Sequence, residues 1–191
     1  MSNDKPVVRK PSRVALIAAA TLAISVLGSQ AAFAQSGGVG SPGSTTAPTT
    51  TTAPPGTMIF PVSGAHTFGG GFGAARSGHS HQGQDIMAAC GTPLVAVSRA
   101  KVKFVSFQSL AGNYVVIRNK KLHQDYMYAH LAARASVTKG TVVQPGQQIG
   151  IVGQTGDATA CHLHFELWAG KYYRGGHPID PIPYLQTYAG Y

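Results

Sequence analysis

Five residues in three short blocks of this sequence have side chains that could bind and use a metal ion. The first block holds His81 and Asp85, the second holds His130, and the third holds His162 and His164. Imidazole nitrogens and carboxylate oxygens are common zinc ligands, and a hydrolytic zinc site needs three protein ligands and one position for water. Two of the four histidines would then remain to accept the proton of the water and to stabilise an oxyanion. The residue types alone do not assign these roles.

Alternation along a β-strand decides which side chains of the third block share a face. In the segment 162–168, His162, His164 and Glu166 would line one face, and the apolar residues between them would enter the core. A solvated polar face is the alternative, but a pair of imidazoles on one face favours metal binding or catalysis. Glu166 would be either a hydrogen-bond partner of an imidazole or, as we expect, an ordinary exposed carboxylate.

The same rule applies to the second block, in the segment 124–131. It places Tyr126, Tyr128 and His130 on one face and the residues that follow each of them on the other. The two tyrosines would then either wall a substrate groove or pack inside the domain. Taken singly, His130 would more often be a structural histidine.

The elements that must position these residues are short strands separated by glycine turns. Segments rich in Val, Ile, Tyr and Phe occur at residues 93–97, 101–107, 113–119, 124–131, 141–143, 148–153 and 162–168. No stretch shows helical periodicity over three turns. The pattern predicts a single all-β domain of antiparallel sheets with long loops.

The N-terminal residues 1–34 have the features of an export signal. Four Lys or Arg precede an apolar run of 15 residues (14–28), and Ala32-Phe33-Ala34 fits a signal-peptidase site. The alternative is an uncleaved membrane anchor, although a membrane span needs about 20 residues. We expect a secreted or cell-envelope protein without stable membrane insertion after signal cleavage.

A tract rich in Gly, Ser, Thr and Pro follows at residues 35–57, without any charged or aromatic residue. Such a segment buries too little apolar surface to fold, so it is predicted to be a disordered linker. The predicted functional domain therefore spans residues 58–191.

The formal charge of the chain limits its partners. Four of the 15 Lys and Arg and one of the six acidic residues lie in the first 34 positions, so the remainder keeps a net charge of +6. A basic exported protein suits anionic cell-wall polymers. Nucleic acid is not expected as a partner, because the Lys and Arg are scattered and form no tract.

The two cysteines, Cys90 and Cys161, are an even number in a chain predicted to be exported, which favours a disulfide. Two buried free thiols are one alternative, and Cys161 as a metal ligand is another. In the chain-entropy model a bridge across so long a loop stabilises a fold by about 4 kcal/mol.

The three blocks together resemble the signature of the lysostaphin-like, LytM-type peptidoglycan endopeptidases, the beta-lytic metallopeptidase family. The resemblance covers about residues 58–187. It rests on the motifs H-x-G-x-D-I from His81, Y-A-H-L ending at Leu131 and H-L-H-F-E from His162, with supporting matches at 91–96, 146–150 and 179–185.

The resemblance implies one zinc ion per domain, held by His81, Asp85 and His164, with His130 and His162 as the catalytic histidines. It also implies a fold of the duplicated-hybrid-motif type with a narrow substrate groove, and peptidoglycan stem or cross-bridge peptides as the substrate. We expect a monomer. A Cys90–Cys161 bridge would brace two of the segments that carry ligands.

The sequence therefore predicts a secreted zinc metalloendopeptidase that acts on peptidoglycan in wall remodelling or lysis. The alternative is a non-catalytic module of the same fold that binds the wall or activates another hydrolase. The complete set of five residues argues against that module. A glycan-cleaving enzyme would need a pair of acids at the cleft, and no such pairing is evident.

Overall fold

The structure is a computed structural model that describes residues 58–188. The predicted signal peptide (1–34) and linker (35–57) lie outside the described residues and stay predictions. The elements in chain order are the strands β1 (His66–Phe68), β2 (Ala75–Arg76), β3 (His79–Ser80), β4 (Gln84–Ala88), β5 (Pro93–Val95), β6 (Ala100–Gln108), β7 (Gly112–Asn119), β8 (Gln124–Leu131), β9 (Val142–Val143), β10 (Gln148–Ile151), β11 (His162–Ala169) and β12 (His177–Ile179), and the helix α1 (Ile182–Tyr188).

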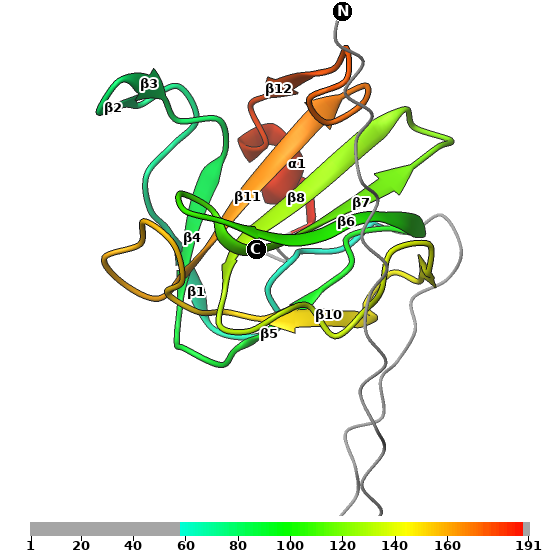
Figure 1. Cartoon of the computed structure of the whole chain (residues 1–191), viewed down its shortest axis with the longest axis horizontal. Coiled ribbons are helices and arrows are strands. Elements are labelled where there is room, and N and C mark those ends of the chain that lie inside the picture. Colours follow the sequence, from blue (N-terminus) through cyan, green and yellow to red (C-terminus); the bar gives the residue numbers. More distant parts are fainter. Residues whose placement is uncertain (1–57, 189–191) are drawn as a thin grey trace, which may run out of the picture. The chain divides into compact units, whose positions relative to one another are not determined.

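One antiparallel sheet of eight strands forms the body of this part of the chain (Figure 1). Its strands follow the order β1-β4-β11-β8-β7-β6-β9, and β12 pairs with β11 outside this path. Two smaller antiparallel pairs, β5 with β10 and β2 with β3, complete the sheets of the described residues. The predicted all-β fold of antiparallel sheets with long loops is confirmed.

The central strands β8 and β11 are buried on both faces, because apolar clusters cover both sides of the sheet. The larger cluster contains Tyr126 and Tyr128 of β8 together with Phe165 of β11. The smaller cluster, on the opposite face, contains Met127 of β8 and Trp168 of β11. This double coverage holds the two strands that carry three of the four site histidines in a rigid part of the domain.

All seven predicted strands are present, with bounds that differ by at most two residues at either end. The sequence reading missed the short strands β1 to β4 and β12, and it missed α1, which has only seven residues. The helix begins after Asp180, whose Oδ1 accepts a hydrogen bond from the backbone N–H of Ile182, and it buries Leu185. No helix within residues 58–188 is long and apolar enough to cross a membrane.

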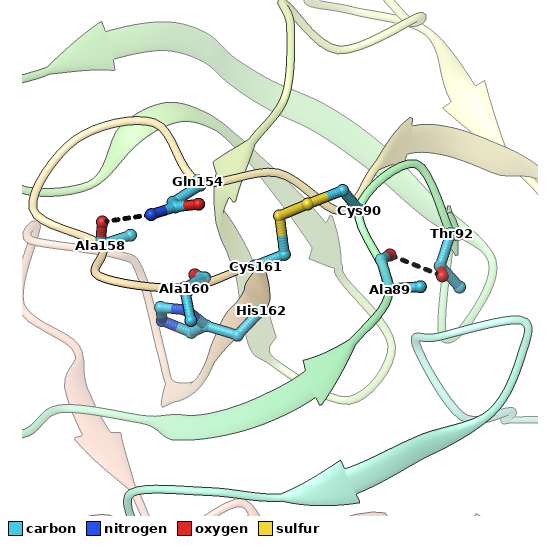
Figure 2. The surroundings of a disulfide bond; sticks show 8 residues. All are labelled: Ala89, Cys90, Thr92, Gln154, Ala158, Ala160, Cys161 and His162. Carbon is cyan, nitrogen blue, oxygen red and sulfur yellow. Dashed lines mark hydrogen bonds between the residues drawn. A yellow bond between two sulfur atoms is a disulfide. The ribbon is translucent and has the colours of Figure 1, made fainter.

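The disulfide prediction is confirmed. Cys90 and Cys161 are bridged, with their Cα atoms 5.3 Å apart, and 71 positions separate them in the sequence. Cys90 lies just after β4 and Cys161 just before β11, so the bridge links the ends of two paired strands (Figure 2). His162 follows Cys161 directly, so the bridge is next to a residue of the proposed site.

Replacing both cysteines (Cys90→Ser with Cys161→Ser) should lower the free energy of unfolding by about 4 kcal/mol, because the long loop is no longer closed in the unfolded state. Denaturant unfolding of the oxidised protein and of the variant measures this difference. Wild-type protein treated with reductant is the matched control and should behave as the variant does. Equal stability of oxidised protein and variant would contradict the bracing role.

Candidate metal centre

Three potential ligand atoms from distant parts of the sequence meet at one point. His81 Nε2 lies 3.0 Å from Asp85 Oδ1 and 2.9 Å from His164 Nδ1, and the last two atoms are 3.1 Å apart. Among the residues that the structure describes, this is the only group of three His, Cys, Asp or Glu close enough to share an ion. The structure therefore brings together the three residues that the sequence reading proposed as metal ligands.

Strand pairing produces this arrangement. Asp85 on β4 is directly opposite His164 on β11 in the antiparallel register, so both side chains leave the same face of the sheet. His81 lies in the loop just before β4. Gly83, between His81 and Asp85, lets this loop pass close to β11, since a Cβ there would collide with the carbonyl oxygen of Phe165 and press on the His164 ring.

Hydrogen bonds fix which nitrogen of each ligand imidazole faces the cluster. The Nδ1–H of His81 donates to the carbonyl oxygen of Gly71 (2.8 Å), which leaves Nε2 as the free lone pair. The Nε2–H of His164 donates to Glu166 Oε1 (3.1 Å), so Nδ1 is the nitrogen that faces the cluster. Such partners on the far nitrogen are typical of metal-binding histidines, because they orient the ring and set its tautomer.

The cluster attracts positive charge. Burial alone would raise the pKa of the Asp85 carboxyl, but hydrogen bonds with His164 and His81 hold this pKa well below its usual value. Burial would likewise lower the pKa of His164, but the carboxylates of Asp85 and Glu166 raise it to about 9. Arg76 on β2 donates to Asp85 Oδ2 (2.7 Å), so Oδ1 is the carboxylate oxygen that faces the two imidazoles.

The geometry fits zinc. Ligands at 2.0–2.1 Å from a tetrahedral zinc ion are roughly 3.3 Å from each other, close to the 2.9–3.1 Å that separates the three ligand atoms in this structure. Two imidazole nitrogens and one carboxylate oxygen are ligands that zinc accepts, and three protein ligands leave one coordination position open.

Two further histidines lie beside the cluster. The rings of His130 and His162 are 4.6 Å apart between centroids, and His130 is 5.9 Å from the His164 ring. The Nδ1–H of His130 donates to the carbonyl oxygen of Thr155 (2.8 Å), and that of His162 to Ala160 (2.9 Å). Both rings therefore keep Nε2 as a proton acceptor, and His162 Nε2 lies 3.6 Å from Asp85 Oδ1.

The placement of His130 corrects the expected alternation along β8. Tyr126 and Tyr128 are fully buried in the larger core, on the face opposite the cluster, so they do not wall a groove. Simple alternation would send His130 to that same core. Instead His130 has φ 61°, and the pairing of β7 with β8 shifts by one residue between Tyr128 and Leu131.

This irregularity is a β-bulge, which adds one residue to β8 and reverses the alternation after Ala129. His130 therefore joins the metal-site face, and Leu131 enters the core instead. A left-handed backbone conformation costs a non-glycine residue about 1–2 kcal/mol, and such strain is concentrated at functional sites. No property of the sequence marks the bulge.

Glu166 was expected to be an exposed carboxylate, and that expectation is wrong. It is 5% exposed, and both of its oxygens are occupied. Oε1 accepts from His164, and Oε2 accepts a 2.6 Å hydrogen bond from the indole Nε1–H of Trp168. The sequence signal for this contact was the position of Glu166 on the same strand face as His162 and His164. No signal indicated the contact between Arg76 and Asp85.

The fold and the site define a class of β-sheet domain in which a His–Asp–His cluster that could hold a metal ion lies beside two further imidazoles. Residues 79–181 match the family described as peptidase family M23. The chain belongs to this family.

Curated relatives agree with this assignment. The chain is 34% identical over 111 residues to the peptidoglycan DD-endopeptidase ShyC of Vibrio cholerae, covering 58% of this chain and 25% of that protein. It is 34% identical over 117 residues to lysostaphin of Staphylococcus simulans, covering 60% of this chain and 23% of that protein. The chain thus spans about a quarter of the length of these relatives.

Solved structures share the fold. The catalytic domain of lysostaphin from Staphylococcus simulans superposes with a TM-score of 0.58 at 30% identity, covering 63% of this chain and 92% of that one. A zinc-containing peptidase from Vibrio cholerae superposes with a TM-score of 0.56 at 32% identity, covering 65% of this chain and 39% of that one.

Glu166→Gln should weaken zinc binding by about 10- to 100-fold, because a neutral amide polarises the His164 imidazole less than a carboxylate does. Competition with a chromophoric chelator measures the affinity. Asp157→Asn is the matched control, since Asp157 is an exposed carboxylate outside the cluster, and it should bind zinc as the wild type does. Unchanged affinity in Glu166→Gln would show that Glu166 does not orient the ligand.

Proposed function

We propose that this chain is an exported zinc metalloendopeptidase that hydrolyses peptide bonds in the stem or cross-bridge peptides of peptidoglycan. The observation that carries the proposal is the triangle of ligand atoms in His81, Asp85 and His164, with His130 and His162 beside it. A module that only binds the wall would not require two spare imidazoles, each with its Nδ1–H held and its Nε2 free.

Three residues of the site would bind the metal ion. His81 Nε2, Asp85 Oδ1 and His164 Nδ1 would hold the ion, and Arg76 would keep Asp85 oriented through its second oxygen. A bound zinc ion supplies Lewis-acid chemistry, which activates water and polarises a carbonyl group.

The two remaining imidazoles would move protons. Burial is the main cause that lowers the pKa of His130 to about 4, so its ring is neutral at physiological pH and its Nε2 can accept a proton. His162 Nε2 has the same lone pair available and lies nearer to Asp85. Between them, these rings would take the proton of the attacking water, stabilise the oxyanion and return a proton to the leaving amine.

The substrate class is supported by the relatives, which are named as peptidoglycan and glycyl-glycine endopeptidases. The Tyr173 hydroxyl donates a 2.6 Å hydrogen bond to Oε1 of Gln82, the residue next to His81. Export through residues 1–34 and a spacer at 35–57 would deliver the domain to this substrate as a monomer.

Alanine substitutions should separate the two groups of histidines. His164→Ala is expected to lose both zinc and activity, whereas His130→Ala should keep zinc and lose about 10²- to 10⁴-fold in turnover. Metal analysis and the release of free amino groups from purified sacculi measure the two properties. His177→Ala, an exposed histidine of β12, is the control and should retain both. Equal zinc loss in His130→Ala and His164→Ala would contradict the assigned roles.

Removal of the metal tests the class of reaction. The protein should release free amino groups from sacculi, a chelator should abolish the release, and added zinc should restore it. No release from any wall chemotype would favour a binding or hydrolase-activating module. New reducing ends in place of amino groups would indicate glycan cleavage instead.

A further inference from the structure

A strongly basic surface lies away from the metal centre, and the proposed reaction does not use it. Two depressions of about 590 and 520 Å³ adjoin there, because Arg118 and Lys120 line both. Neither depression is lined by an Asp or a Glu. We define the basic face as the cations that line them: Arg99, Lys101, Arg118, Lys120, Lys121, Lys171 and Arg174.

The positive charge of the basic face is almost uncompensated. Arg118 forms a two-pronged ion pair with the buried Asp125, which neutralises it. None of the other six cations has a carboxylate partner within 4.0 Å among residues 58–188. Lys101 is directly opposite Arg118 on neighbouring strands, where like charges destabilise a sheet. Burial and the charges of Arg118 and Lys101 also lower the pKa of the adjacent Lys103.

The basic face and the metal centre lie at opposite ends of the same strands. On β8, Asp125 is beneath the basic face, and His130, five residues later, is at the metal centre, which corresponds to about 17 Å along the strand. On β11, His164 is at the metal centre, and Gly170, just beyond the other end, lines the second depression. A ligand on the basic face would therefore leave the cluster accessible.

We propose that the basic face binds a linear phosphodiester polymer attached to the cell wall and so holds the enzyme against its substrate. Two adjoining depressions share Arg118 and Lys120, and each adds further cations of its own, so together they suit a chain of repeated phosphates better than one small anion. The choice of a wall polymer rests on the proposed function.

The lining residues disfavour two other polyanions. Single-stranded nucleic acid is bound by stacking bases on aromatic rings, and no Phe, Tyr or Trp lines either depression in the described part of the chain. A membrane surface is bound by an amphipathic apolar face, whereas only Leu122 and Val142 add exposed large apolar side chains here.

The test uses the full zinc-loaded chain and lipid-free poly(glycerol phosphate) as the probe. Lys120→Gln with Lys171→Gln should weaken binding at least about tenfold and lower the slope of log affinity against log salt by about 1.4. Arg134→Gln with Lys139→Gln removes the same charge from exposed residues that line neither depression, and it should change affinity less than about twofold. Both variants should cleave a soluble peptide substrate at the wild-type rate.

Walls with and without their phosphodiester polymers complete the test. The Lys120/Lys171 variant should digest intact walls more slowly than the wild type and stripped walls equally fast. Equal loss of binding in both double variants, no binding of the polymer by an active enzyme, or tighter binding of single-stranded DNA or phosphatidylglycerol vesicles would overturn the proposal. A protein that binds the polymer through the basic face but cleaves no peptide would refute the proposed function, while the proposal that the basic face binds the polymer would stand.

Discussion

The register between β4 and β11 is the constraint on which the rest of the site depends. It places Asp85 directly opposite His164, so that a carboxylate and an imidazole from segments 79 residues apart point at one location. A slip of one residue would turn one of the two side chains to the other face of the sheet, and the ligand atoms would no longer meet. Burial of both strands and the disulfide at their ends oppose such a slip.

Neighbouring residues orient the side chains that the strand register brings together. Each candidate ligand makes a hydrogen bond through the atom that points away from the cluster. Arg76 donates to Asp85, the Gly71 carbonyl oxygen accepts from His81, and Glu166 accepts from His164. Partners of this kind orient the ligand side chains of a metal site. The bulge at His130 has a comparable effect on β8, because it brings a proton-accepting ring from the core side of the strand to the site.

Local patterns predicted the strands, whereas the five candidate site residues were proposed from three short motifs and from the family resemblance. Enrichment in Val, Ile, Tyr and Phe between glycine turns located β6, β7, β8 and β11, and period-2 alternation put His162 and His164 on one face, which the structure bears out. The arrangement across strands had no such signal, since neither the contact of Arg76 with Asp85 nor the bulge at His130 is encoded by spacing. The short strand β4 was missed because its residues are buried through pairing with β1 and β11 and not through a periodic pattern of its own. Glu166 was misjudged because a carboxylate becomes buried only when partners such as Trp168 and His164 are already in place.

X-ray absorption at the zinc edge, together with metal stoichiometry of the full chain, tests the central claim most directly. We expect one zinc per chain with nitrogen and oxygen ligands at about 2.0 Å, two of them showing the scattering of imidazole, and no sulfur ligand. In the His164→Ala protein the imidazole signal should fall or the metal should be lost. A sulfur ligand, or a zinc site that persists unchanged without His164, would contradict the account.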